Sequence, residues 1–305
     1  MKILVFTEKP FAPAAVKAIE NSINASGNEL EVVEGGTRAD LLEAVRNADG
    51  LIVRSDKIDN DIMDAAPQLK VIVRAGAGYD NIDLEAATKH GICVMNTPGQ
   101  NSNAVAELVF GMIIMMCRNQ YNGKSGTELK DKTLGLYAFG QVGRNVARIA
   151  KGFGMHVSAL DKFVPDVMME GEGVKPLHSA DELFSENQFV SLHIPATAET
   201  RKSIGYDLVM KMPQNGVLIN TARKEVIDEE GLMKALEERP DLRYVSDIKP
   251  DTAEEFEKKF AERVFFTPKK MGAQTAEANF NAGVAAAEQA VAYLTDGWDK
   301  YRVNK

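Results

Sequence analysis

The sequence predicts an α/β fold with two doubly wound parallel sheets, and three observations support this fold class. Short apolar runs alternate with segments of helical periodicity from the first residue onward, as in repeated βαβ units. The alternation is interrupted once, near residue 100, and then starts again. The 305 residues are also enough to build two separate hydrophobic cores.

The first half of the chain contains five apolar runs that end at polar or turn-forming residues. These runs predict strands at residues 2–7, 29–33, 50–54, 69–74 and 93–96. Helical spacing of apolar residues fills two of the intervals, at residues 14–26 and 40–48. Strands that alternate with helices in this way form a parallel sheet with helices on both faces.

The second half begins after a turn-rich cluster, NTPGQNSN, at residues 96–103. A long helix is predicted from residue 104 to about residue 118, followed by strands at residues 133–138, 155–160, 188–193, 216–220, 244–248 and 264–266. An alanine-rich closing helix at residues 282–294 is expected to return to the first sheet. We therefore predict a flavodoxin-like substrate domain at residues 1–98 and 284–305, and a Rossmann domain at residues 99–283.

Composition and charge disfavour several classes of protein. An apolar share of 45% and a charged share of 26% are those of an ordinary soluble protein, and a net charge of −8 disfavours general nucleic-acid or anionic-membrane binding. Cys93 and Cys117 lack the spacing of a disulfide framework or zinc site, so we expect no metal and a reducing, cytoplasmic compartment. The N-terminal residues predict a strand rather than a signal peptide, and the apolar helix at residues 108–117 is too short to span a bilayer.

Residues 134–143, LGLYAFGQVG, contain a glycine-rich turn between a predicted strand and a predicted helix. In a dinucleotide-binding fold, Gly140 would let the backbone approach a pyrophosphate, and Gly143 would let the helix pack closely on the strand. The amino end of the helix would offer free N–H groups to the anion. Ala138 stands where the first glycine of G-x-G-x-x-G is expected, and we expect it to be tolerated through a negative φ.

An acidic residue, Asp161, follows at the end of the next predicted strand, 18 residues after Gly143. Its carboxylate can accept hydrogen bonds from both ribose hydroxyls of NAD and would repel the 2′-phosphate of NADP. Lys162 beside it weakens that preference. In the alternative interpretation, the glycines serve only a tight turn and Asp161 is a surface cap.

Several predicted strands end in cationic or polar residues, and ligands bind at the carboxyl ends of parallel strands. In the first half these residues are Arg54, then Arg74 with the glycines after it, and Asn101 in the turn cluster. In the second half the strands end in HIP at 193–195, NTAR at 220–223, SDIKP at 246–250 and TPKK at 267–270. If the two domains face each other, these ends form one cleft that favours an anion, whereas a single strand-end arginine is usually a solvated cap.

Several motifs carry a resemblance that extends over essentially the whole chain: RAGAGYDNID, NTPGQN, the glycine turn with Asp161, LHIP, NTARKEVIDEEGL and TPKKMGAQT. Together they resemble the D-isomer-specific 2-hydroxyacid dehydrogenases, which use NAD. The resemblance implies cofactor contacts from the turn and the strand ends: Gly140, Gln141, Val142, Asp161, His193, Ile194, Pro195, Thr221, Ala222, Arg223, Asp247 and Gly272. It implies substrate contacts from Arg54, Arg74, Gly76, Ala77, Gly78 and Asn101.

Within this family, Arg54, the RAGAG loop and Asn101 resemble members that oxidise 3-phosphoglycerate with NAD at the start of serine biosynthesis. Arg54 would then hold the distal phosphate, and Arg223 would clamp the carboxylate with its planar fork. The resemblance also implies a homodimer through the helix region at residues 103–118. The chain lacks room for the C-terminal regulatory domain of longer members, so serine feedback through such a domain is not expected.

Two catalytic positions of the family are altered in this sequence. Thr252 stands where the family has a glutamate, with Asp251 as the nearest acid, and a lysine stands where the family has a histidine. Alignment from MGAQT selects Lys270 as that lysine, whereas reading forward from the preceding TP selects Lys269. We expect Lys270 to be the general base in oxidation, with its pKa lowered by burial and by nearby cations.

The joint loss of the glutamate and the histidine fits a working lysine, because an amine has no tautomer to fix and an adjacent acid would make it a weaker base. The same loss would fit a non-catalytic NAD-binding protein that senses redox state. A sensor, however, has no need of Arg223, Arg54 and Asn101. The other alternative is a sibling dehydrogenase that acts on another 2-hydroxy or 2-keto acid, such as glyoxylate or hydroxypyruvate.

Overall fold

The computed structural model describes residues 1–304, and the chain forms two compact units. The N-terminal unit comprises Met1–Asn101 and Gln274–Lys305, and the central unit comprises Ser102–Ala273. The predicted border at 283/284 falls inside one continuous helix, α12 (Ala276–Asp296), which belongs wholly to the N-terminal unit. Each unit is built on a parallel sheet, so the predicted fold class is confirmed.

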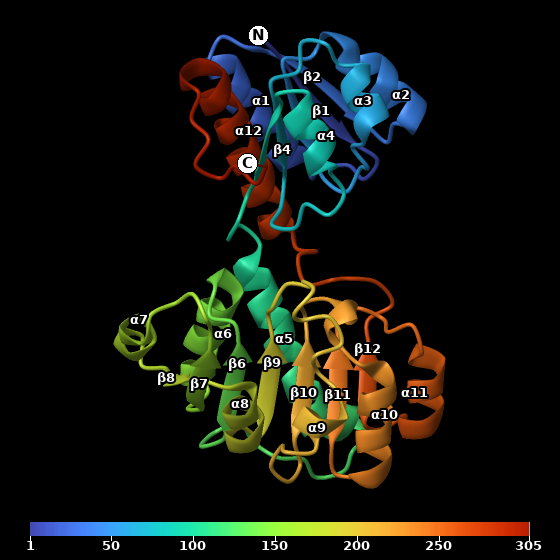
Figure 1. Ribbon diagram of the computed structural model, residues 1–305, viewed down its shortest axis with the longest axis vertical. Coiled ribbons are helices and arrows are strands. Elements are labelled where there is room, and N and C mark those ends of the chain that lie inside the picture. Colours follow the sequence, from blue (N-terminus) through green and yellow to red (C-terminus); the bar gives the residue numbers. More distant parts are fainter. Residues whose placement is uncertain (305) are drawn as a thin grey trace. The chain divides into compact units, whose positions relative to one another are not determined.

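The N-terminal unit contains a five-stranded sheet in the order β2-β1-β3-β4-β5. Its strands are β1 (Lys2–Thr7), β2 (Glu29–Glu34), β3 (Gly50–Val53), β4 (Val71–Arg74) and β5 (Cys93–Asn96). Helices α1 (Pro13–Ala25) and α12 lie side by side on one face, blue and red in Figure 1. The other face packs against α2 (Arg38–Ala44), α3 (Asn60–Asp64) and α4 (Leu84–Lys89). This strand order is that of the predicted flavodoxin-like fold.

Helices on both faces explain why these strands are continuous apolar runs in the sequence. Successive strand residues point to opposite faces of a sheet. Ile3 and Val5 therefore pack with α1 and α12, while Leu4 and Phe6 pack with the helices on the other side.

The edge of β5 is covered by the segment that follows α12. Val303 N donates to Val94 O, and the side chain of Asn304, 2% exposed, continues the pairing. Asn304 Oδ1 accepts from Val94 N at 2.8 Å, and its Nδ2 donates to Ile92 O at 2.8 Å. One side chain thus satisfies backbone groups that an edge strand would leave unpaired.

The Asn304→Ala variant is expected to lose about 2–3 kcal/mol of unfolding free energy, because two buried backbone groups lose their hydrogen-bond partners. Urea unfolding followed by circular dichroism measures this loss. Asn24, exposed on α1, provides the control, and Asn24→Ala should change the free energy by less than about 0.5 kcal/mol. Equal small effects of the two substitutions would contradict the role given to Asn304.

The central unit contains a seven-stranded parallel sheet in the order β12-β11-β10-β9-β6-β7-β8. Its strands are β6 (Thr133–Tyr137), β7 (His156–Leu160), β8 (Lys175–Leu177), β9 (Phe189–Leu192), β10 (Val217–Asn220), β11 (Arg243–Ser246) and β12 (Val264–Phe266). The strand order reverses between β6 and β9, which is the point where doubly wound sheets bind ligands. Strand β8 is absent from the sequence prediction, because its three residues, KPL, form no apolar run.

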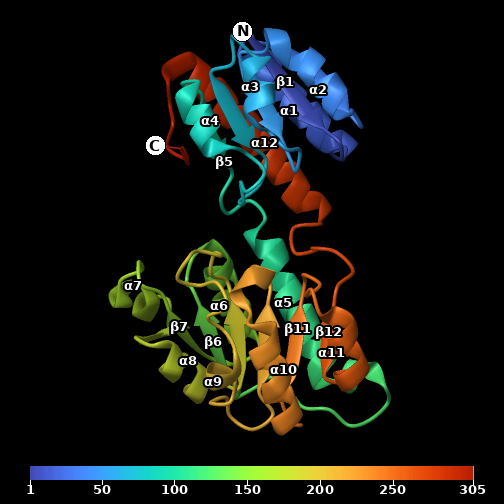
Figure 2. The same ribbon diagram turned by 45° about the vertical axis from the view of Figure 1, so that its right-hand side comes forward.

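Helices cover both faces of this sheet (Figures 1 and 2). One face packs against α5 (Ser102–Cys117) and α6 (Gln141–Gly152). The other packs against α8 (Ala180–Glu186), α9 (Tyr206–Val209), α10 (Glu229–Glu238) and α11 (Ala253–Phe260). Within residues 1–304, no helix has the length and apolar character that a membrane crossing needs.

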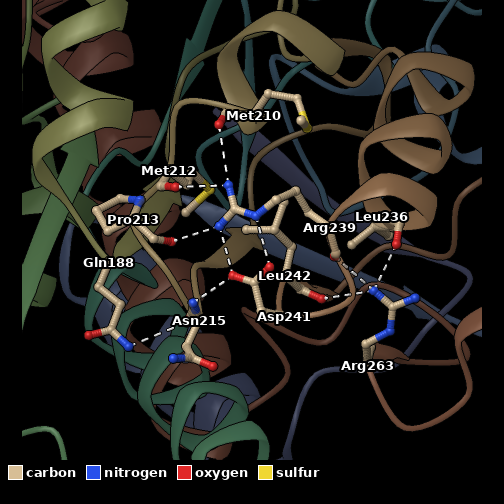
Figure 3. A network of polar contacts seen from close by, with 10 residues as sticks. All are labelled: Gln188, Met210, Met212, Pro213, Asn215, Leu236, Arg239, Asp241, Leu242 and Arg263. Atoms are coloured by element: carbon tan, nitrogen blue, oxygen red, sulfur yellow. Dashed lines mark hydrogen bonds and ion pairs between the residues drawn. The ribbon is translucent and has the colours of Figure 1, made fainter.

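The amino ends of β10 and β11 are held by a polar network around Asp241 (Figure 3). Arg239 donates to both carboxylate oxygens, Nε–Oδ1 at 2.8 Å and NH2–Oδ2 at 2.7 Å, and Asn215 N donates to Oδ2 at 2.8 Å. The hydrogen bond from Arg239 opposes desolvation and lowers the pKa of Asp241 to about 2. The carboxylate therefore stabilises the unit above its unfolded pKa of ~3.9, and this contribution is lost as the pH falls toward 2. The opposite ends of the same strands carry the candidate site.

Candidate active site

The glycine-rich turn connects β6 to α6 in the central unit. A Cβ at Gly143 would collide with the carbonyl oxygen of Ala138, so the helix can approach the turn this closely only because residue 143 is glycine. A Cβ at Gly140, which precedes the helix, would meet nothing within 4 Å, so its backbone is open to a ligand. The arrangement fits a bound pyrophosphate at the amino end of α6.

The expectation of a negative φ at Ala138 is wrong, because its φ is +89°. Ala138 N donates to Leu160 O at 2.9 Å, which continues the pairing of β6 with β7 into the turn. The backbone of the G-x-G-x-x-G turn is thus kept, and alanine adopts the left-handed conformation that the usual glycine would take without strain.

Replacing Ala138 with glycine is expected to raise the free energy of unfolding by about 0.5–1 kcal/mol. The left-handed region costs alanine about 1–2 kcal/mol that glycine avoids, and the greater freedom of glycine in the unfolded chain offsets part of the gain. Thermal unfolding of the variant tests this. Ala147→Gly, inside the regular helix α6, should instead lose about 1 kcal/mol, and the same sign for both variants would refute the strain argument.

Asp161 ties the end of β7 to the glycine turn. Its Oδ2 accepts from Phe139 N at 2.8 Å, and its Oδ1 accepts from Phe163 N at 2.8 Å and Val164 N at 3.1 Å. The carboxylate thus caps the loop, as the alternative interpretation of Asp161 expected, and it also lies beside the glycine turn. The Nζ of Lys162 lies 2.7 Å from Glu199 Oε2, so this lysine has a carboxylate of its own to pair with.

The loop after β10 is shaped by an asparagine that the sequence analysis did not single out. Asn220 Oδ1 accepts from Ala222 N at 2.9 Å, and its Nδ2 donates to Arg223 O at 2.9 Å. A strand-ending asparagine before the TAR motif is the signal that could have identified it, because asparagine side chains commonly bond to backbone two or three residues on. Asn220 therefore sets the position from which Arg223 extends.

His193 follows β9 and borders the same loop, with its Nδ1 3.4 Å from Thr221 Oγ1. Its Nε2 is buried and has no hydrogen-bond partner among residues 1–304. Burial lowers the pKa of His193 to about 3, so the ring stays neutral near pH 7. A ring that does not titrate there fits a positioning role rather than acid–base catalysis.

Lys270 and Arg223 share one hydrogen-bond acceptor. Lys270 Nζ donates to Ala222 O at 3.0 Å, and Arg223 NH1 donates to the same oxygen at 2.9 Å. The structure therefore brings Lys270 beside the predicted carboxylate clamp. The neighbouring Lys269 is exposed, and its carbonyl oxygen accepts from Thr267 Oγ1. Lys270 lies four residues after the edge strand β12 and is exposed, so its expected burial is wrong.

An acid close to this pair is Asp247, which directly follows β11. Burial raises the pKa of Asp247, while the charges of Lys270 and Arg223 act in the opposite direction. Asp247 Oδ2 accepts from Gly272 N at 2.9 Å, and Oδ1 is buried without a partner among residues 1–304. An acid is thus close enough to act on Lys270 electrostatically, although the glutamate of the family is missing.

Thr252, which stands at the position of the family glutamate, and the adjacent Asp251 both form hydrogen bonds to groups outside the lysine–arginine pair. Asp251 Oδ1 accepts from Lys224 Nζ at 2.5 Å. The backbone N–H groups of Asp251 and Thr252 donate to the carboxylate of Glu229, at 3.0 and 2.9 Å. Lys224 therefore pairs with Asp251, the acid nearest to the missing glutamate.

The N-terminal unit carries the predicted substrate residues at the ends of β3 and β4. Arg74 Nε donates to Arg54 O at 3.0 Å, and Gly76 has a φ of +148° that suits glycine. Asn96 Nδ2 donates to Ala77 O at 2.6 Å and fixes the RAGAG loop, which includes Gly78. Asn101, half-buried, is the last residue of this part of the unit. The remaining predicted cofactor residues, Gln141, Val142, Ile194 and Pro195, lie in the central unit after β6 and β9.

A glycine turn at the switch point of a doubly wound sheet, with an acid at the end of the next strand, defines the dinucleotide-binding class of α/β proteins. The sequence pattern of one family, described as D-isomer specific 2-hydroxyacid dehydrogenase, catalytic domain, matches residues 3–304. The chain belongs to this family of dehydrogenases.

Similar proteins come from several organisms. The chain is 37% identical over 304 residues to the D-3-phosphoglycerate dehydrogenase of Methanocaldococcus jannaschii, covering 95% of this chain and 56% of that protein. It is 36% identical over 280 residues to the hydroxypyruvate reductase of Thermotoga maritima, covering 86% and 90%. A crystal structure of NAD+-bound 3-phosphoglycerate dehydrogenase from Entamoeba histolytica has 49% identity and a TM-score of 0.90, covering 100% of this chain and 99% of that one. The chain thus spans little more than half the length of the first relative.

Proposed function

We propose that the protein oxidises 3-phosphoglycerate to 3-phosphohydroxypyruvate with NAD, the first step of serine biosynthesis. The observation that carries this proposal is the pair formed by Lys270 and Arg223 on the carbonyl oxygen of Ala222. A proton-transferring amine beside a carboxylate clamp is what oxidation of a 2-hydroxy acid requires. The 3-phosphoglycerate dehydrogenases among its relatives support the choice of substrate.

The residues of the central unit fit NAD. The glycine turn leaves room for a pyrophosphate, and the carboxylate of Asp161 beside it would repel the 2′-phosphate of NADP. Asp247 Oδ1 and His193 Nε2 are buried polar atoms without partners among residues 1–304, so a polar group of a ligand can satisfy them. When bound, NAD supplies the acceptor for the C2 hydride.

Each protein group has one task in the reaction. Arg223 holds the substrate carboxylate with its fork, assisted by Arg74 and the N–H groups of the RAGAG loop. Lys270, as the free amine, takes the proton of the C2 hydroxyl while the C2 hydride leaves, which yields the 2-keto acid. In the reverse direction the ammonium returns that proton. Arg54 binds the distal phosphate.

The proposed assembly is a cytoplasmic homodimer formed through α5. Gly111 on this helix is exposed, and Leu108, Ile114 and Met115 are only partly buried, which leaves an apolar stripe on the outer side of α5. Such a stripe suits a second copy of the same helix.

Reduction of hydroxypyruvate is the second candidate function. The Thermotoga maritima relative is a hydroxypyruvate reductase of about the same length as this chain. The guanidinium of Arg54 also forms hydrogen bonds within its own unit. An arginine with a purely structural role, and no phosphate to bind, would form such bonds too. The two candidates differ in whether the protein needs the phosphate of its substrate.

The test compares two substrates that differ only by that phosphate, 3-phosphoglycerate and D-glycerate. NADH formation at 340 nm gives kcat/KM for each, on the wild type and on Arg54→Met. We expect the wild type to prefer 3-phosphoglycerate by about 100-fold or more and Arg54→Met to lose most of that preference. A wild type with equal activity on both acids would favour the hydroxypyruvate alternative, and no activity on either would refute the proposal.

A further inference from the structure

The guanidinium of Arg54 lies in a preformed cradle in the N-terminal unit. Its NH1 donates to Lys9 O at 3.0 Å and to Pro10 O at 2.9 Å, and its NH2 donates to Asn279 Oδ1 at 2.5 Å. The ring of Phe11 lies beneath it, with the guanidinium carbon 5.1 Å from the ring centre. Arg54, which follows strand β3, is therefore fixed by groups from two other segments: the loop after β1 and helix α12.

Asn279 is the only one of these groups that comes from α12, and its amide is oriented by that helix. Its Nδ2 donates to Thr275 O at 2.8 Å, while Thr275, the N-cap residue, accepts from Ala278 N with its side chain at 3.1 Å. The bond from Asn279 Nδ2 to Thr275 O identifies the amide oxygen of Asn279 as the atom that faces Arg54, because the amide nitrogen already donates to the backbone. The acceptor for the guanidinium is thus supplied by the first turn of α12.

The cradle leaves part of Arg54 available to an anion. Arginine has five N–H donors, and the three bonds use both hydrogens of NH1 and one of NH2. Nε–H and the second hydrogen of NH2 have no partner within residues 1–304. Two donors on one guanidinium are what a phosphate group takes in a bidentate contact.

A neutral acceptor at residue 279 preserves the positive charge that a phosphate needs. The nearby carboxylates, Glu34 and Asp56, act on the guanidinium only through space, and both bond to backbone N–H groups. Glu34 Oε1 accepts from Phe11 N at 2.7 Å, and Asp56 accepts from Glu8 N at 2.7 Å and Arg54 N at 3.3 Å. No carboxylate within residues 1–304 forms a salt bridge with the guanidinium. An aspartate at position 279 would hold the arginine equally close but would neutralise it.

We propose that Asn279 is a positioning residue that makes the enzyme specific for substrates with a distal phosphate, because it fixes the guanidinium of Arg54 without cancelling its charge. This inference rests on the proposed function, in which Arg54 binds that phosphate. Asn279 itself touches Arg54 and need not touch the substrate.

The experiment measures kcat/KM for 3-phosphoglycerate and for D-glycerate on the full chain carrying Asn279→Ala, Asn279→Asp or Arg54→Met. For both Asn279 variants, KM for 3-phosphoglycerate should rise about tenfold, with kcat and all D-glycerate constants within about twofold of the wild type. Inorganic phosphate should also become a weaker competitive inhibitor by a similar factor. Asn281→Ala is the matched control, because Asn281 is exposed two residues along the same helix.

The outcomes separate the two proposals. If Arg54→Met lowers the preference for 3-phosphoglycerate but both Asn279 variants keep it, the positioning role is refuted and the proposed function stands. Equal losses on both substrates in the Asn279 variants also refute it, because they indicate only a structural role. If Arg54→Met leaves the preference unchanged, Arg54 does not bind the phosphate, and the inference fails together with that part of the proposed function. Asn279→Asp keeps an acceptor for Arg54, so it remains informative if Asn279→Ala does not fold.

Discussion

Replacing Lys270 with methionine is expected to lower kcat for 3-phosphoglycerate oxidation by about 10³-fold and to leave the affinity for NAD within about twofold. Methionine has a similar length and no proton to exchange, so the substitution removes the chemistry and keeps the volume. The hydrogen bond that is lost, to Ala222 O, leaves an acceptor that Arg223 still satisfies. Steady-state NADH formation and fluorescence titration with NADH measure the two quantities.

Lys269→Met is the matched control for this prediction. Lys269 is adjacent in sequence and exposed, and within residues 1–304 its hydrogen bond to the fold is made by the backbone carbonyl. It should keep at least half of the wild-type rate. Near-normal turnover of Lys270→Met together with a large loss in Lys269→Met would contradict the prediction, because it would assign the proton transfer to Lys269.

The pH profile gives an independent check on the same amine. Oxidation requires the free amine, and a free lysine titrates near pH ~10.4, so the rate of the wild type should rise with pH on the alkaline side. His193 does not contribute to this rise, because its pKa lies at about 3. Lys270→Met should lose the alkaline rise along with most of its activity.

Arg223→Gln is expected to reduce kcat/KM by about 10²–10³-fold, with the loss divided between KM and kcat. Glutamine can offer one N–H to the substrate carboxylate but neither the second donor of the fork nor the charge. The variant should also alter the environment of Asp247, because the charge of Arg223 favours ionisation of that carboxylate. Initial rates at varied 3-phosphoglycerate measure the loss.

The Lys224→Met variant tests whether the effect of Arg223→Gln comes from a lost grip on the substrate carboxylate or only from a lost positive charge. Lys224 is adjacent to Arg223 but pairs with Asp251, so its removal should change kcat/KM by less than about threefold. If Lys224→Met were as damaging as Arg223→Gln, the effect of Arg223 would be electrostatic rather than a specific grip on the carboxylate.

The sequence was sufficient for features that depend on pattern and spacing. Buried parallel strands are visible as apolar runs, and the requirement for glycine at position 143 follows from the helix that must pack against the turn. The choice of Lys270 over Lys269 came from motif spacing, and the structure places Lys270 beside Arg223.

Features that depend on tertiary geometry were not visible. Ala138 has a positive φ and bonds to Leu160, which is far from it in sequence, so its conformation depends on a contact that the local pattern does not reveal. The exposure of Lys270 and the proximity of Asp247 depend on how three strand ends are arranged, which residue type does not reveal. Asn304 and Asn279 look like surface asparagines in the sequence, and their roles arise from contacts with β5 and with Arg54.

The hydrogen bonds of Asp161 have a practical consequence for redesign of coenzyme preference. The usual way to convert such an enzyme to the phosphorylated coenzyme is to remove the strand-end acid. Here the same carboxylate also anchors Phe139 N in the turn and two amides of the following loop. An Asp161→Ser exchange would therefore loosen the pyrophosphate turn while it relieves the repulsion, whereas a basic residue introduced at Phe163, which is exposed, would change the charge and leave the turn intact.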